Sequence, residues 1–213
     1  MKMFVKICGI TRLPDANLAA ELGATAIGFI FWPASPRYIA PDAARAIVRR
    51  MAPKVMTVGV FVNEAAQRLG QIVDEVGLDV AQLHGSESPD FCREFAGLGA
   101  PKPEGRRRVI KAIGMKNGDA IDVDAFDSDV LILLDAHDPA RHGGTGRRVD
   151  WNLARRIAAS RRTILSGGLD AANVGAAIEA VHPFGVDVSS GVESAPGVKD
   201  AARMRSFFEA LNG

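Results

Sequence analysis

A regular alternation of short apolar runs with amphipathic stretches extends along the whole chain, and it constrains the fold more than any other feature. Several runs, such as residues 55–62, are β-branched and apolar on both faces, which is typical of strands in a buried parallel sheet. The predicted strands lie at residues 3–7, 24–31, 55–62, 79–83, 108–113, 129–135, 162–166 and 184–189. The predicted helices lie at residues 12–22, 41–51, 64–76, 88–96, 117–125, 150–159, 170–180 and 198–211, with N-caps expected at Thr11, Asn63, Ser88 and Asp170.

Eight successive β-α units predict an α/β fold in which a parallel sheet closes into a (β/α)8 TIM barrel, with residues 1–213 as a single domain. The alternative is a doubly wound open sheet. That fold usually carries a glycine-rich dinucleotide loop after its first strand, and Cys8-Gly9-Ile10-Thr11 does not supply one. The stretch from Gly97 to Gly105 is interpreted as a surface insertion on the face away from the site.

Composition excludes several classes of function. A net charge of +1 gives no general attraction to nucleic acid or to an anionic membrane, and no apolar run is long enough to span a bilayer. The two cysteines, Cys8 and Cys92, form no disulfide framework, and Cys92 is interpreted as core filler on a helix. No Cys or His spacing predicts a metal site. We therefore expect a cytoplasmic enzyme.

Two reactive groups stand where barrel enzymes place their sites, at the C-terminal ends of strands. Cys8 follows the first strand and is expected to present an exposed thiol, and Asp135 ends the sixth strand after four apolar residues. A substrate between them would meet a base on one side and an acid on the other. Lys6 shares the face of Cys8 and would favour the thiolate, or it is an ion-pair partner of Asp187. Asp135 has the alternative role of a helix cap.

The last two strands run into small residues, which suggests an anion site. Gly167 and Gly168 follow the seventh strand, and residues 189–191, which are Ser189, Ser190 and Gly191, follow the eighth. Backbone N–H groups that are free of side chains at these positions predict phosphate binding, and tight turns without a ligand are the alternative. Gly144 and Gly146 belong to a loop after the sixth strand that is interpreted as a lid adding further amides, or else as a plain surface loop.

Three further side chains are candidates for substrate binding. Arg37 follows Ser35-Pro36 in a rigid loop and suits a carboxylate, with a surface arginine as the alternative. His84 ends the fourth strand and would bind a carboxylate or hydroxyl, with a structural histidine as the alternative. Asp187 on the eighth strand is the third candidate.

The motifs at the strand ends, taken together, resemble the phosphoribosylanthranilate isomerase family. They are Lys6-Ile7-Cys8-Gly9-Ile10-Thr11, Ser35-Pro36-Arg37, Gln82-Leu83-His84-Gly85, Leu133-Leu134-Asp135, Gly143-Gly144-Thr145-Gly146, Ser166-Gly167-Gly168-Leu169 and Asp187-Val188-Ser189-Ser190-Gly191-Val192-Glu193, and they occur in the family's order from residue 3 to about residue 200. Arg147 departs from the family, which often has lysine there.

This resemblance implies an isomerase of tryptophan biosynthesis that interconverts an aldose and a ketose without cofactor or metal. The reaction is the Amadori rearrangement of N-(5-phosphoribosyl)anthranilate, a small-molecule phosphosugar, to 1-(2-carboxyphenylamino)-1-deoxyribulose 5-phosphate. The resemblance implies that Asp135 protonates the ribose ring oxygen, that Cys8 removes the proton from C2, and that Arg37 faces the anthranilate. A monomer and a homodimer are both compatible with the sequence.

Two alternatives compete with this function. A related histidine-pathway isomerase would carry aspartate at the position of Cys8 and phosphate loops in both halves of the chain. A phosphosugar-binding barrel without catalysis would need no acid and base. A decarboxylase or aldolase barrel would need a strand-end lysine as Schiff base or electrophile, but Lys111 stands two residues before the end of its predicted strand.

Overall fold

The eight apolar runs form a closed barrel in the computed structural model, which describes residues 3–51, 55–97, 107–115, 122–135 and 151–212. All strand pairs of the barrel are parallel, each strand pairs with the next, and β8 pairs with β1. The strands are β1 Phe4–Ile7, β2 Ala26–Ile30, β3 Met56–Phe61, β4 Val80–Leu83, β5 Arg108–Gly114, β6 Leu131–Asp135, β7 Thr163–Ser166 and β8 Gly185–Val188. The predicted (β/α)8 barrel is therefore confirmed, and the open sheet is excluded.

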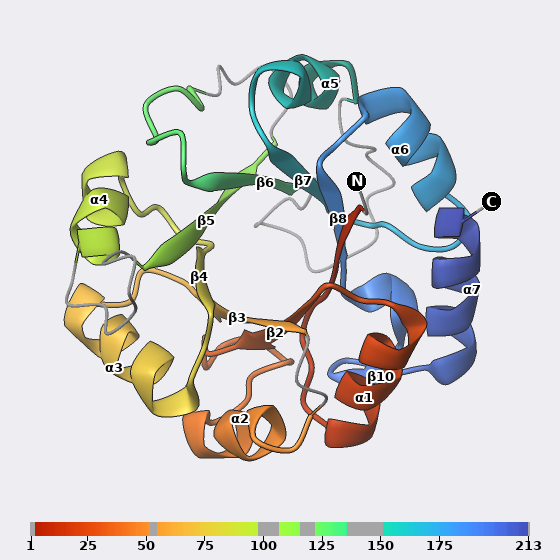
Figure 1. The fold of residues 1–213 in the computed structure, drawn as a ribbon, viewed down its shortest axis with the longest axis horizontal. Coiled ribbons are helices and arrows are strands. Elements are labelled where there is room, and N and C mark those ends of the chain that lie inside the picture. Colours follow the sequence, from red (N-terminus) through yellow and green to blue (C-terminus); the bar gives the residue numbers. More distant parts are fainter. Residues whose placement is uncertain (1–2, 52–54, 98–106, 116–121, 136–150, 213) are drawn as a thin grey trace.

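Helices surround the barrel, as the view along it shows (Figure 1). In the described part of the chain they are α1 Leu13–Leu22, α2 Pro41–Val48, α3 Ala66–Val76, α4 Pro89–Gly97, α5 Trp151–Ser160, α6 Val174–Val181 and α7 Ala201–Asn212. After β8, a short 3-10 turn η1 Ser190–Val192 leads into a small antiparallel pair, β9 Glu193–Ala195 and β10 Val198–Lys199. Because α7 packs against both α1 and α6, the two ends of the chain close the outer layer. None of the helices within the described ranges has the length and apolarity needed to cross a membrane.

The predicted helix at 117–125 is wrong over its described part, residues 122–125, which form a turn, and residues 117–121 lie outside the described residues. The carboxylate of Asp122 accepts hydrogen bonds from the backbone N–H groups of Asp124 and Ala125, at 3.1 Å each. Aspartate side chains that bond to nearby backbone compete with the helix in this way. The insertion expected from Gly97 to Gly105 also falls almost entirely outside the described residues.

The N-cap expectations are met only in part. Ser88 accepts a hydrogen bond from the backbone N–H of Phe91 at the start of α4, as predicted. The predicted caps Thr11 and Asn63 are wrong, because α1 and α3 have Arg12 and Ala65 at their N-caps. Asp170 caps the turn that precedes α6 instead of the helix itself, because its carboxylate accepts hydrogen bonds from the backbone N–H groups of Ala172 and Asn173.

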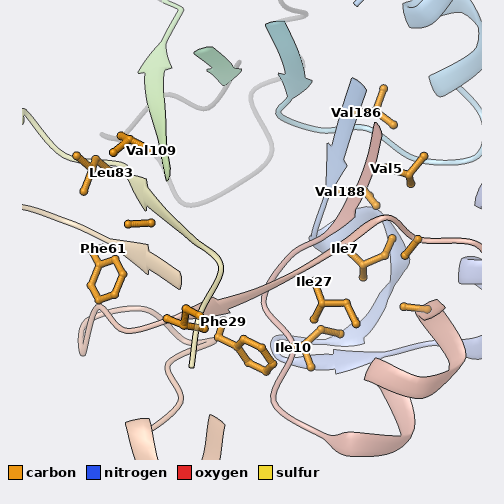
Figure 2. Packing of buried hydrophobic residues seen from close by; sticks show 14 of the residues in the cluster. Val5, Ile7, Ile10, Ile27, Phe29, Phe61, Leu83, Val109, Val186 and Val188 are labelled. Carbon is orange, nitrogen blue, oxygen red and sulfur yellow. The ribbon is translucent and has the colours of Figure 1, made fainter. Parts of the chain in front are cut away.

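The core has two layers, because successive residues of a strand point to opposite sides of the sheet. Residues that point into the barrel form the smaller cluster of Phe4, Ala26, Val58, Val80, Ile110, Ala112, Leu133 and Ile164. Residues that point outward, such as Val5, Ile7, Ile27, Val186 and Val188, pack beneath the helices (Figure 2). The apolar interior of the barrel means that a polar side chain pointing inward must find its partners in the layer above this cluster.

Candidate functional site

Lys6, Asp187 and Ser166 point into the barrel above the apolar layer and form a buried polar network. The strand register places Lys6 of β1 directly beside Asp187 of β8. The Lys6 Nζ atom donates to Asp187 Oδ1 at 2.8 Å, and the Ser166 Oγ atom donates to Asp187 Oδ2 at 3.0 Å. The predicted ion pair between Lys6 and Asp187 is thus present. Asp187 as a substrate-binding residue stays a prediction.

Cys8 lies one step beyond β1 and continues its inward-facing side. Its backbone N–H donates to Val188 O of β8 at 2.8 Å, which fixes the residue at the end of the barrel. Next to it, Gly9 has φ +74, in the left-handed region that glycine adopts without strain. The thiol is buried, with 6% of the residue exposed, so the expectation of an exposed thiol is corrected.

Burial raises the pKa of the Cys8 thiol above its usual value of 9.0, because the thiolate loses hydration. Lys6 acts in the opposite direction, through its charge and a hydrogen bond to the sulfur, but it does not cancel the effect of burial. Burial also lowers the pKa of Lys6 itself, yet Asp187 and Cys8 outweigh it and hold that pKa above its usual range. Lys6 therefore stays charged beneath the sulfur, and it both pairs with Asp187 and favours the thiolate.

Gly28 on β2 makes room for this arrangement and was not predicted as a functional residue. A Cβ atom at Gly28 would lie 3.0 Å from the Cys8 Sγ atom and 3.1 Å from the Lys6 Nζ atom. A glycine inside a strand often marks such a close approach. The signal was therefore present in the sequence, in the middle of the second apolar run.

Asp135 ends β6 and is linked to His84. Its Cα lies in register with Gly114 of β5 and Ser166 of β7. The carboxylate is largely buried, with 13% of its side chain exposed, and its Oδ2 atom lies 3.2 Å from the His84 Nε2 atom. The Gln82 Nε2 atom lies 3.0 Å from the other ring nitrogen of His84, Nδ1. His84 thus stands between an amide and the carboxylate, with about a third of its side chain open to solvent.

Arg37 lies near Cys8 but is already paired. Its guanidinium donates to Glu193 of β9 through Nε, at 3.0 Å to each carboxylate oxygen, and through Nη2, at 2.7 Å to Oε2. The Arg37 side chain remains 22% exposed. Sequence reasoning missed Glu193 as a partner, because nothing in the pattern indicates that the β9–β10 pair folds back against the loop after β2.

The loops after β7 and β8 lie against each other. Gly167 and Gly168 have φ +88 and +68, in the left-handed region. Ser190 and Gly191 belong to the turn η1, and a Cβ atom at Gly191 would lie 2.0 Å from Leu169 O. Only glycine permits this approach of the two backbones. The predicted phosphate residues of these loops are therefore neighbours, whereas Gly144 and Gly146 lie outside the described residues, as does Arg147.

Lys111 does not reach this site. It points outward from β5, and its Nζ atom donates to Glu87 Oε2 at 2.7 Å and to Gly85 O at 2.7 Å. This buried ion pair occupies the layer beneath the helices, so the alternative of a Schiff-base lysine at the mouth has no support from Lys111. Among the described residues, no group of three or more His, Cys, Asp or Glu side chains is arranged to hold a metal ion.

Comparison with known proteins identifies close relatives. The family model described as N-(5'phosphoribosyl)anthranilate (PRA) isomerase matches residues 5–210. The N-(5'-phosphoribosyl)anthranilate isomerase of Pelobacter propionicus is 49% identical over 203 residues, which cover 95% of this chain and 92% of the relative.

Solved structures agree in fold over the full length. A crystal structure of phosphoribosyl anthranilate isomerase from Thermotoga maritima has a TM-score of 0.86 and 41% identity, with 100% of both chains covered. A second crystal structure, of the isomerase in complex with reduced 1-(o-carboxyphenylamino)-1-deoxyribulose 5-phosphate, has a TM-score of 0.82 and 39% identity, again with 100% of both chains covered.

Proposed function

The chain belongs to the N-(5'-phosphoribosyl)anthranilate isomerase family, and from this premise we propose that it performs the family's reaction with Cys8 as general base and Asp135 as general acid. The enzyme is an isomerase of tryptophan biosynthesis that converts an aldose into a ketose. The substrate is N-(5'-phosphoribosyl)anthranilate, which carries a phosphate at one end and a carboxylate at the other. Such a ligand needs an anion site at both ends and an acid and a base between them.

Asp135 acts first, as the acid. Its carboxyl proton passes to the ribose ring oxygen as the bond from that oxygen to C1 breaks, and the nitrogen lone pair forms a C=N double bond. The product of this step is an open-chain protonated Schiff base, and Asp135 is left as a carboxylate. The His84 Nε2 atom, 3.2 Å from Asp135 Oδ2, is placed to share a proton with that carboxylate.

Cys8 acts second, as the base. Its thiolate takes the proton from C2, the C–H electrons form a C1=C2 bond, and the nitrogen becomes a neutral amine. The resulting enolamine gains a proton at C1 and loses one from its C2 hydroxyl, which gives the ketone. A proton that passes from Cys8 to Asp135 through solvent restores the starting enzyme. Burial raises the pKa of the Cys8 thiol, which makes the thiolate a strong base. The charge of Lys6 acts in the opposite direction and favours formation of the thiolate.

Binding is divided between the two ends of the substrate. The adjoining loops at Gly167–Gly168 and Ser189–Gly191 offer backbone amides to the phosphate, and Gly144 and Gly146 are proposed to add theirs. Arg37 is proposed to face the carboxylate of the anthranilate. His84 and Asp187 are proposed to contact the sugar or to support the residues that do.

One observation carries the mechanism: Cys8 and Asp135 lie at the same end of the barrel, on strands separated by two others, and each has a charged or ionisable partner beside it. The test is to measure turnover of Cys8→Ala and Asp135→Asn. Each is expected to lose about 10²- to 10⁴-fold in kcat, the usual contribution of a general acid or base. Binding of the reduced product analogue should persist, which shows an intact site. Full activity of either variant would refute its assigned role.

A further inference from the structure

Glu193 is a buried carboxylate with no place in the mechanism above, and it holds the guanidinium of Arg37 by one edge. The hydrogen bonds use Nε and Nη2. The Nη1 atom, with two N–H donors, takes no part in them. An arginine held in this way is fixed in direction and still presents its opposite edge to a second carboxylate.

The stem of Arg37 crosses the backbone beside Cys8. A Cβ atom at Gly9 would lie 2.7 Å from the Arg37 Cδ atom and 3.1 Å from the Ser189 Oγ atom. The bare Cα of Gly9 thus lets the side chains of Arg37 and Ser189 both lie against the residue that follows the base. A shift of the Arg37 side chain would therefore change the packing around Gly9 and Ser189.

Lys199 of β10 forms hydrogen bonds with Glu193 and with the backbone of Cys8 and Ser189. Its Nζ atom donates to Cys8 O at 2.5 Å, to Ser189 O at 3.1 Å and to Glu193 Oε1 at 2.8 Å. The lysine is buried, with 4% of the residue exposed. One ammonium group therefore joins the backbone of the base, the backbone of a phosphate-loop residue and the carboxylate that holds Arg37.

The cluster of Arg37, Glu193 and Lys199 carries one net positive charge. Arg37 and Lys199 each contribute one positive charge and Glu193 one negative charge. Burial alone would raise the pKa of Glu193, but Arg37 and Lys199 outweigh it and hold that pKa below its usual value of 4.5, so Glu193 stays ionised at neutral pH. A substrate carboxylate beside Arg37 would bring the cluster to neutrality.

We propose that Glu193 and Lys199 are positioning residues that set the specificity of this enzyme for a substrate that carries a carboxylate. Glu193 aims the free edge of Arg37 at that carboxylate, and Lys199 fixes the distance from Arg37 to the base and to the phosphate loop. This inference rests on the proposed function, in which Arg37 faces the anthranilate carboxylate.

The test compares two substrates in each variant: N-(5'-phosphoribosyl)anthranilate and the matching aniline compound, which lacks the carboxylate. Glu193→Gln keeps the shape of the side chain and removes its charge. It is expected to raise KM for the anthranilate substrate about tenfold, as loss of a charged hydrogen-bonded contact does, and to leave kcat and the aniline substrate nearly unchanged. The ratio of kcat/KM for the two substrates should fall by the same factor.

Glu87→Gln is the matched control. Glu87 is likewise buried and ion-paired, with the Lys111 Nζ atom at 2.7 Å, but it lies away from Arg37. Its loss should lower stability and leave the ratio between the two substrates unchanged. Lys199→Met is a second variant. It is expected to raise KM for both substrates, because it releases Ser189 as well as Glu193.

The outcomes separate this inference from the proposed function. If Arg37→Met loses the preference for the carboxylate and a folded Glu193→Gln keeps it, the positioning role is wrong and the role of Arg37 stands. If Arg37→Met keeps the preference, Arg37 does not face the carboxylate and the proposed binding mode fails. If Glu193→Gln lowers kcat equally for both substrates, its role is structural only. Should Glu193→Gln not fold, unchanged KM values in Lys199→Met would overturn the inference.

Discussion

The Nε2 atom of His84 lies 3.2 Å from the Oδ2 atom of Asp135, although the two residues end strands that are separated by β5. The other ring nitrogen of His84 lies 3.0 Å from the Gln82 amide nitrogen. A hydrogen bond on each side fixes the imidazole ring, and the fixed ring in turn holds the carboxylate. This geometry supports a role for His84 in placing the proposed acid, as an alternative to the substrate contact that stays a prediction from the sequence.

The first prediction separates these two roles. We expect His84→Leu to lower kcat about 10- to 100-fold, because Asp135 loses the partner that orients it, while KM changes by less than about twofold. Steady-state kinetics on the anthranilate substrate give both constants. A rise in KM with kcat unchanged would instead show that His84 binds the substrate directly.

The second prediction concerns the space above Gly28. We expect Gly28→Ala to lower kcat at least about tenfold, because the new methyl group would press on Cys8 Sγ and on the Lys6 side chain at about 3 Å and displace them. Gly175→Ala in α6 is the matched control, since its Cβ atom would meet only Ala210 O at 3.6 Å. Equal activity of the two variants would contradict the role assigned to Gly28.

The third prediction uses the charges around the thiol. Burial raises the pKa of Cys8, Lys6 lowers it, and Asp187 raises it. Asp187→Asn removes a negative charge and frees Lys6 for the sulfur, so the pKa of Cys8 should fall. Because the thiolate is the base, the rising limb of kcat/KM against pH should move to lower pH.

The thiol pKa of that variant is measured from the ultraviolet absorbance of the thiolate, with Cys8→Ser as the blank so that Cys92 cancels. A limb that stays in place while the thiol pKa falls would show that Cys8 is not the group that titrates in catalysis. A limb that moves upward would contradict the sign of the Asp187 effect.

Much of this architecture follows from local pattern. Each of the eight strands is an apolar run whose side chains face the barrel interior and the helices in alternation. Strands buried on both faces are easy to recognise in a sequence, because nearly all of their residues are apolar. Cys8 and Asp135 were predicted for the same reason, because a reactive group directly after such a run must lie at the strand end. The helix at 117–125 failed because aspartates that bond their own backbone compete with helix formation, as Asp122 does.

The parts that could not be predicted depend on contacts between residues far apart in the chain. Glu193 and Arg37 are 156 positions apart, and Lys199 is 191 positions from Cys8. No periodicity encodes such pairs. The burial of Cys8 was missed for a related reason: its thiol lies against Gly28 of the next strand, a contact that the pattern around Cys8 does not reveal.

The last prediction concerns the segment where the expected helix is missing. Arg161, directly after α5, donates to four backbone carbonyls of the connection between β5 and β6, at 2.9 to 3.2 Å: Val123, Phe126, Asp127 and Val130. These bonds give partners to carbonyl groups in a segment that forms neither helix nor strand. We expect Arg161→Lys to lower the free energy of unfolding in urea by about 2 kcal/mol, because an ammonium cannot span the four carbonyls as the planar guanidinium does.

The exposed Arg155 on α5 is the control, and Arg155→Lys should change stability by less than about 0.5 kcal/mol. Equal stability of the two variants would mean that the connection is held by other contacts and that Arg161 adds nothing to it.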